Sequence, residues 1–337
     1  MAGRRPTMAD YDYELPDSAI AQEPCEPRDA ARLLVALGPD VAHARVRDLP
    51  GLLRPGDLLV ANDTRVLPAR LHLHKPTGGA AEVLLLEPAG AVADEWEALV
   101  RPARRLPPGT VLADGAGRAL VEVGPRTGRG TWHVRVLAPP WAAGEVPLPP
   151  YIHGSLADPD RYQTVFAARP GSVAAPTAGL HLTHNVLSAC ARRGIGFATV
   201  DLQVGLDTFR PVTVEDPARH QIHSEAYRVP EATWEACLRA RAAGGRVVAV
   251  GTTTVRALES VAATGELAGR TALFILPPYR FAVVDVLVTN FHLPRSSLLL
   301  LVEAFAGPRW RDLYAVALNE GYRFLSFGDA MCIGPAA

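Results

Sequence analysis

A block of short apolar segments between residues 66 and 137 constrains the fold of this chain most strongly. Glycine and proline turns, such as Thr77-Gly78-Gly79 and Pro107-Pro108-Gly109, divide the segments from one another. The segments are 71–74, 82–87, 96–100, 111–113, 119–123 and 131–137. Six short strands at regular spacing, without helical periodicity, predict a small antiparallel β-barrel or sandwich.

The sequence on either side of this block has a different pattern. Strands are expected before it at 32–37, 41–46 and 58–61, and after it at 196–204, 246–250, 273–276 and 283–289. Helical periodicity is expected over 185–193, 231–243, 253–263, 295–306 and 308–319. Alternating helices and strands indicate α/β architecture. We therefore predict an α/β main domain of residues 1–63 and 150–337, with a small antiparallel β-barrel domain inserted at 64–149.

The net charge of −1, from 34 lysines and arginines and 35 aspartates and glutamates, excludes a protein that coats nucleic acid with a generally basic surface. Lys75 is the single lysine, which leaves 33 arginines. Arginine is permanently charged and forms bidentate contacts with phosphates and carboxylates. A local basic groove therefore remains open, and it would consist of arginine.

We expect the chain neither to span a membrane nor to be secreted. The longest aliphatic run, 298–302, is far shorter than the roughly 20 residues of a membrane span. The four cysteines are far apart and form no Cys-x-x-Cys pair, so neither a disulfide framework nor a thiolate zinc site is indicated. A cytoplasmic location is expected.

Histidines gather in the second half of the chain beside small and hydroxyl residues. His181 follows Thr177-Ala178-Gly179, and Thr183 is a plausible N-cap of a helix at whose free N–H groups an anion could lie. His220 and His223, at i and i+3, precede Glu225; this pattern suits acid–base chemistry, with metal binding as the rival. The bland alternative is that these histidines are exposed or structural.

Two strands are expected to end in polar residues. Strand 246–250 leads into Gly251, followed by Thr252, Thr253, Thr254 and Arg256, which resembles a cradle for a phosphate or carboxylate. It is neither a Walker A loop nor a dinucleotide fingerprint. Strand 283–289 ends in Asn290-Phe291-His292, which delivers an amide and an imidazole to a strand end, where α/β sheets place ligands.

Many separate motifs in one order resemble a known family. They are Tyr11-Asp12-Tyr13-Glu14-Leu15-Pro16, Ile20-Ala21-Gln22-Glu23-Pro24, Asn62-Asp63-Thr64-Arg65 to Arg70, Arg161-Tyr162-Gln163-Thr164-Val165, residues 174–181, Phe209-Arg210-Pro211, His223-Ser224-Glu225, residues 251–259, residues 289–294 and Gly328-Asp329-Ala330-Met331. From about residue 11 to 333, the chain resembles the S-adenosylmethionine:tRNA ribosyltransferase-isomerase family of queuosine biosynthesis.

The resemblance implies the same fold, an α/β domain with an inserted β-barrel. It also implies that S-adenosylmethionine serves as ribosyl donor to 7-aminomethyl-7-deazaguanine at the wobble position of a tRNA with a GUN-type anticodon. Adenine and methionine leave, and the product is epoxyqueuosine-tRNA. The resemblance implies no metal and no cofactor, because S-adenosylmethionine is a substrate. The expected enzyme is a cytoplasmic monomer.

The reaction needs a base, a proton donor and a neutral attacking amine. Our hypothesis assigns the acid and base duties to His223 and His181, with Glu225 orienting or charging one of them. Arg210 and Arg256 would hold the methionine carboxylate or a tRNA phosphate. Further substrate contacts are expected from the following residues: Thr177, Thr252, Thr253, Thr254, Asn290 and His292. Arg65 and Arg70 are candidates for contact with the tRNA backbone.

The chain departs from the family pattern at His184, Gln203, Asp207 and Pro278. These positions lie in motif-rich loops, so a paralogue that passes the ribosyl group to a small-molecule acceptor remains an alternative. A non-catalytic tRNA- or nucleoside-binding relative is a second alternative. The density of titratable residues near His223 and His292 argues against it, because binding alone does not require them.

Overall fold

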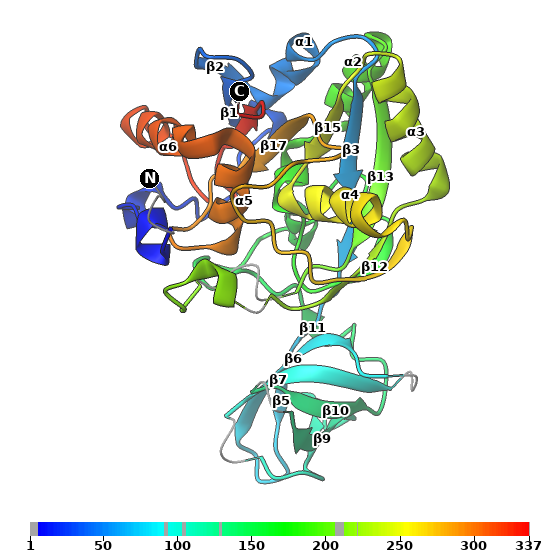
Figure 1. The fold of residues 1–337 in the computed structure, drawn as a ribbon. Helices are drawn as coiled ribbons and strands as arrows, with labels where there is room; N and C mark the ends of the chain where they lie inside the picture. Colours follow the sequence, from blue (N-terminus) through cyan, green and yellow to red (C-terminus); the bar gives the residue numbers. More distant parts are fainter. Residues whose placement is uncertain are drawn as a thin grey trace. The chain divides into compact units, whose positions relative to one another are not determined.

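The computed structural model describes residues 6–90, 94–102, 106–127, 130–205, 212–220 and 222–336. The chain divides into two compact units (Figure 1). Unit 1 comprises Met1–Thr64, Pro149–Arg169 and Ala175–Ala337, and unit 2 comprises Arg65–Leu148 and Pro170–Ala174. Unit 2 therefore includes the short segment 170–174, which our division by sequence assigned to the main domain.

A nine-stranded mixed sheet forms the centre of unit 1, in the order β16-β14-β13-β3-β15-β17-β18-β1-β2. Strands β13 (Gly196–Leu202), β3 (Leu58–Asn62), β15 (Val247–Val250) and β17 (Val286–Asn290) are parallel neighbours. Every residue of β3, β15 and β17 is buried. Continuous apolar runs of this kind are typical of parallel strands covered on both faces.

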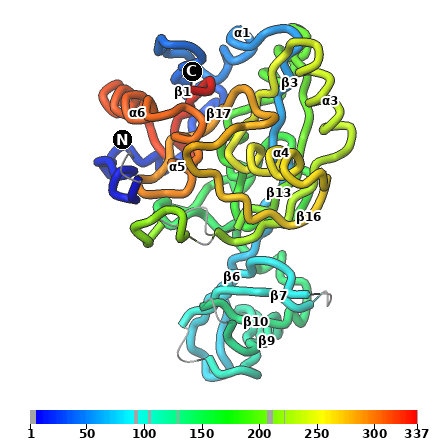
Figure 2. The backbone as a smooth tube through the Cα atoms, viewed as in Figure 1, coloured from blue at the N-terminus to red at the C-terminus, as the bar shows by residue number. Residues whose placement is uncertain are grey.

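Antiparallel strands extend both ends of this parallel centre. On one side lie β14 (Glu225–Arg228) and β16 (Ala268–Thr271). On the other side β18 (Ala330–Ile333) pairs with β17 and also with β1 (Arg32–Ala36), which pairs with β2 (Ala42–Arg45). The C-terminal strand thus lies beside the first strand of the chain (Figure 2).

Helices cover both faces of the sheet. Alternate residues of the parallel strands, Leu59 and Ala61 in β3 and Val248 and Val250 in β15, form one buried cluster with side chains of α1 (Leu49–Leu52) and α2 (His184–Arg192). Helices α3 (Glu231–Ala242) and α4 (Thr252–Thr264) contact the same strands. Because successive strand residues point to opposite faces, the remaining strand residues are available to α3 and α4. Helices α5 (Ser297–Ala306) and α6 (Trp310–Asn319) follow β17 in the chain.

Unit 2 is a closed antiparallel β-barrel, which confirms the predicted fold class. Its strands are β5 (Arg70–His74), β6 (Ala80–Pro88), β7 (Glu95–Arg101), β8 (Val111–Ala113), β9 (Ala119–Arg126) and β10 (Trp132–Val136). They pair in the order β5-β6-β7-β10-β9-β8, and the pairing of β8 with β5 closes the barrel. In β7, Trp96, Ala98 and Val100 are buried, so the period-2 pattern of the sequence marks the barrel interior.

Three short strands complete the fold. β11 (Gly144–Glu145) pairs with β5, and β4 (Thr64–Val66) pairs with β12 (Arg169–Ser172). Within the described residues, no helix combines the length and the apolar character needed to cross a membrane.

The predicted strand at 273–276 is wrong. The backbone of this segment forms hydrogen bonds with side chains instead of with a neighbouring strand. Leu273 O accepts from Arg256 Nε, and Leu273 N donates to Thr271 Oγ1. The strand in this region is β16, at 268–271, which pairs with β14. β16 escaped prediction because three of its four residues are exposed, and β14 because its residues Glu-Ala-Tyr-Arg form no apolar run.

Candidate functional site

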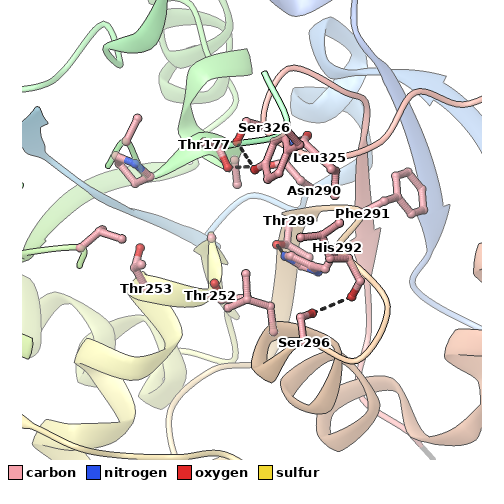
Figure 3. Close-up of a pocket in the computed structure, with 18 residues that line it drawn as sticks. Thr177, Thr252, Thr253, Thr289, Asn290, Phe291, His292, Ser296, Leu325 and Ser326 are labelled. Atoms are coloured by element: carbon pink, nitrogen blue, oxygen red, sulfur yellow. Dashed lines mark hydrogen bonds between the residues drawn. The ribbon is translucent and has the colours of Figure 1, made fainter. Parts of the chain in front are cut away.

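A pocket lies at the carboxyl ends of β15 and β17 in unit 1. Its empty volume is about 590 Å³, part of it open to solvent. Thr252 and Thr253 reach it from the start of α4, Asn290 and His292 from the end of β17, and Thr177 from the 3₁₀ helix at 177–181 (Figure 3). We call it the nucleoside pocket, after the part of the substrate that its threonines and Asn290 are expected to contact. Five of the predicted substrate residues thus share this pocket, whereas Thr254 and Arg256 do not line it.

A glycine brings the start of α4 close to the opposite wall. Gly251 has φ of +89°, a conformation that disfavours a side chain, and a Cβ there would meet the Ala178 Cβ at 3.6 Å. Asn62, at the end of β3, donates from Nδ2 to Thr253 Oγ1 at 3.2 Å. Thr254 Oγ1 instead donates to Val250 O at 2.7 Å, so it is occupied within the helix and does not line the pocket.

Asn290 connects several segments through one amide. Its Oδ1 accepts from Thr177 Oγ1 at 3.1 Å, and its Nδ2 donates to Leu325 O at 3.2 Å. Because Nδ2 carries the donors, the 3.1 Å contact between Nδ2 and His181 Nε2 makes Nε2 an acceptor. The His181 ring is therefore neutral, with its proton on Nδ1. Burial, together with Arg323 and Arg28, lowers the pKa of His181 to about 4.

His292 is a second neutral imidazole. Burial lowers the pKa of His292 to about 3. The Tyr314 hydroxyl accepts from the His292 backbone N–H at 3.0 Å and lies 3.3 Å from Nδ1. The other ring nitrogen, Nε2, is 3.3 Å from Thr289 Oγ1. Tyr13 fixes the same residue from the N-terminal side by donating from its hydroxyl to His292 O.

A second pocket, which we call the ion-pair pocket, contains another group of predicted residues. It is lined by His220, Ile222, His223, Glu225, Arg256, Leu273, Phe274, Ile275, Ser297, Leu298 and Leu301. Leu298 also lines the nucleoside pocket, so the two are neighbours. Glu225 accepts from Gly205 N at 2.9 Å and forms an ion pair with Arg256.

Arg256 was expected to bind an anionic group of the substrate, but in the structure it contacts groups of the protein. Besides its ion pair with Glu225, its Nε donates to Leu273 O at 3.0 Å and its Nη2 to Thr271 O at 3.4 Å. The guanidinium is thus held by groups of the protein itself. His220 packs against the Phe274 ring. Within the described residues, no three His, Cys, Asp or Glu side chains are arranged to hold a metal ion.

The three predicted catalytic residues do not lie in one pocket. His223 and Glu225 line the ion-pair pocket, whereas His181 lines a third pocket and is linked to the nucleoside pocket by its contact with Asn290. Arg65 is exposed in β4 and Arg70 lies in β5, both in unit 2. Arg210, like Asp207, lies outside the described residues.

A carboxylate of the protein lies beside the expected anion site at Thr183. Thr183 does cap α2, because its Oγ1 accepts from Val186 N at 3.2 Å. The same hydroxyl donates to Asp29 Oδ2 at 2.9 Å, so a carboxylate of the protein already lies at this helix end. A free anion would be repelled there. His184, the first residue of α2, is exposed.

Sequence reasoning missed several hydroxyl residues of the nucleoside pocket. Tyr151 follows the proline-rich stretch, and its hydroxyl lies 2.7 Å from Ser326 Oγ. Ser296 lines the same pocket and caps α5 by accepting from Leu299 N at 3.3 Å. Only Ser296 had a usable signal, because a serine before an apolar helix is a common N-cap.

Comparisons with known proteins agree with these motifs. A family model described as queuosine biosynthesis protein matches residues 8–333. The S-adenosylmethionine:tRNA ribosyltransferase-isomerase of Gloeobacter violaceus is 53% identical, covering 97% of this chain and 96% of that protein. The Thermus thermophilus protein of the same name is 52% identical, covering 96% of this chain and 98% of its own length.

A solved structure is similar as well. The crystal structure of S-adenosylmethionine tRNA ribosyltransferase from Thermotoga maritima matches with a TM-score of 0.56 and 38% sequence identity. The match covers 96% of this chain and 99% of that one. The chain belongs to the queuosine biosynthesis protein family.

Proposed function

We propose that this chain is an S-adenosylmethionine:tRNA ribosyltransferase-isomerase. It transfers the ribosyl moiety of S-adenosylmethionine to 7-aminomethyl-7-deazaguanine in tRNA and isomerises it, which yields epoxyqueuosine-tRNA and releases adenine and methionine. Family membership over nearly the whole chain supports the reaction class. The observation that carries the assignment is the nucleoside pocket, in which hydroxyl, amide and imidazole groups converge at the carboxyl edge of the sheet.

The lining of this pocket suits the nucleoside part of a sulfonium donor. None of its described lining residues is an acid, a lysine or an arginine. Thr252, Thr253 and Asn290 offer hydrogen bonds to a ribose and a base edge, while Leu293 and Leu298 offer apolar walls to an adenine ring. His292, with its pKa lowered to about 3, is neutral at pH 7 and does not repel the sulfonium.

The acid and base duties fall to His223 and His181, with Glu225 as the charged partner. Their pockets adjoin the nucleoside pocket on two sides, through Leu298 and through Asn290. Glu225 is held by Gly205 N and Arg256. These two contacts fix the position of the carboxylate. Proton removal beside the sulfonium and protonation of the leaving adenine both need such positioned groups.

The partners follow from the reaction. The acceptor is a tRNA with a GUN-type anticodon, and Arg65 and Arg70 contact its backbone. S-adenosylmethionine is consumed as a substrate, and the reaction uses no metal or other cofactor. The enzyme acts as a monomer, in the cytoplasm where tRNA is modified.

Adenine release tests the proposal. The protein is incubated with S-adenosylmethionine and tRNA that carries the deazaguanine base, and adenine is quantified by chromatography. Adenine that appears only with this tRNA supports the proposal, whereas adenine without tRNA points to a small-molecule acceptor. His223→Ala should abolish release while donor binding persists, and the exposed His153→Ala should behave like the wild type. Full turnover by His223→Ala would refute the catalytic assignment.

A further inference from the structure

A small basic pocket adjoins the nucleoside pocket, and the reaction scheme leaves it without a ligand. It is lined by Pro24, Cys25, Arg28, Arg161, Leu180, His181, Ser326 and Phe327. We call it the arginine pocket. Its empty volume is about 230 Å³, less than half that of its neighbour. Ser326 lines both pockets.

The two arginines are fixed in place by backbone carbonyls. Arg28 donates to Gln163 O at 2.6 Å and to Asp160 O at 2.8 Å. Arg161 donates to Cys25 O at 2.7 Å. A neutral carbonyl orients a guanidinium but does not compensate its positive charge. Because each guanidinium has five N–H donors, both retain donors for a further acceptor.

Two arginines and no described carboxylate line this pocket, while Glu26, Asp158 and Asp160 act on Arg28 from outside the lining. Burial and the neighbouring Arg161 lower the pKa of Arg28, as expected where two guanidiniums approach each other away from water. Glu26 lies 3.1 Å from Arg161, but its side chain is 77% exposed and well screened. An oxyanion between the arginines would relieve the repulsion.

His181 adds a neutral donor to the same wall. Its Nε2 accepts from Asn290, so its proton lies on Nδ1. Across the described chain, no hydrogen-bond partner is found for Nδ1. A neutral N–H beside two guanidiniums suits an anionic ligand, and the Asn290 contact joins this ligand site to the nucleoside pocket.

The donor molecule has an acid group that the nucleoside pocket does not accommodate. No described residue of that pocket carries a positive charge, and Arg256 is already occupied by Glu225 and two carbonyls. Apart from Arg256, the cations among the described residues that line a pocket sharing a residue with it are Arg28 and Arg161.

We propose that the arginine pocket binds the α-carboxylate of the methionyl group of the donor, with Arg28 and Arg161 as its cationic partners and His181 as a neutral donor. The inference rests on the proposed function, since it requires S-adenosylmethionine as the ligand. It assigns His181 a binding contact in addition to its proposed acid–base duty, and it transfers the predicted carboxylate contact from Arg256 to this pair.

Calorimetric binding of two ligands tests the proposal. The probes are S-adenosylmethionine and its decarboxylated form, which lacks only the carboxylate. The wild type should bind the first at least about tenfold more tightly, because a hydrogen bond to a charged group contributes about 1.5–3 kcal/mol. Arg161→Gln should remove that preference by weakening the first ligand alone. Arg28→Lys, which keeps the charge but loses the bidentate guanidinium group, should reduce the preference for S-adenosylmethionine.

Arg239→Gln is the matched control, because Arg239 is exposed on α3 and forms its ion pair with Glu235 of the same helix. It should retain the full preference. Equal weakening of both ligands by Arg161→Gln, or no weakening, overturns the proposal. So does an unchanged preference with weakened tRNA binding, which would indicate a phosphate site. If the wild type binds neither ligand, the proposed function itself fails, and this outcome is distinct from the others.

Discussion

Replacing Arg256 by methionine tests whether this arginine is structural or binds substrate. The Arg256 and Glu225 side chains are 8% and 9% exposed, so their ion pair is buried. Arg256→Met keeps the length and removes the charge, the ion pair and the bond to Leu273 O. Glu225 would keep one hydrogen bond, from Gly205 N. Breaking a buried pair in this way costs about 3–5 kcal/mol of unfolding free energy.

The double variant Arg256→Met/Glu225→Gln provides the matched comparison. Glutamine still accepts from Gly205 N but carries no charge, so the uncompensated buried carboxylate disappears. The double variant should therefore be more stable than Arg256→Met by about 1–3 kcal/mol. A double-mutant cycle that adds Glu225→Gln alone gives the interaction energy of the pair.

Urea unfolding followed by tryptophan fluorescence measures these free energies. Binding of S-adenosylmethionine by each folded variant is measured in parallel. The structural role predicts a large stability loss for Arg256→Met, restored in part by Glu225→Gln. A loss below about 1 kcal/mol, together with at least tenfold weaker donor binding, would refute this reasoning and restore Arg256 as the carboxylate partner.

Three further predictions concern other parts of the chain. Asn290→Asp places a negative charge beside His181 Nε2, so the His181 pKa should rise from about 4; an NMR titration that finds no rise would contradict the assigned tautomer. Burial raises the pKa of both Asp63 and Asp201, so the stability they contribute at low pH is lost as pH rises through those pKa values. The free energy of unfolding of Asp201→Asn, measured with urea, should therefore increase relative to that of the wild type from about pH 4 upward. A difference that stays constant with pH would contradict this prediction. Arg65→Gln should lower the salt dependence of tRNA binding by roughly 0.7–0.9 in the log–log slope, whereas Arg118→Gln, whose arginine pairs with Asp114, should not.

The barrel and the parallel strands could be predicted because their burial follows the chain locally. Trp96, Ala98 and Val100 alternate with exposed or half-buried residues, and β3 is a continuous apolar run. β14 and β16 could not be predicted, because neither contains an apolar run that would mark it as a strand. The apolar segment 273–276 was misassigned because its side chains form a pocket wall and its backbone bonds to Arg256 and Thr271.

The site was predictable where chemistry follows directly from a strand end. Thr252 and Thr253 after β15, and Asn290 and His292 after β17, lie together because parallel strands end at one edge of the sheet. The pairing of Arg256 with Glu225 was not predictable, since it joins residues 31 positions apart. The arginine pocket depends on residues 133 positions apart, Arg28 and Arg161, which no local pattern connects.

Double isotopic labelling of the donor tests the central claim most directly. One S-adenosylmethionine sample carries ¹³C in the ribose and another carries ¹³C in the methyl group, and each is incubated with the protein and tRNA bearing the deazaguanine base. The masses of the nucleosides from the digested tRNA are then measured by mass spectrometry. Ribosyl transfer predicts that the modified nucleoside carries the ribose label and lacks the methyl label. A nucleoside that carries the methyl label, or neither label, would contradict the account.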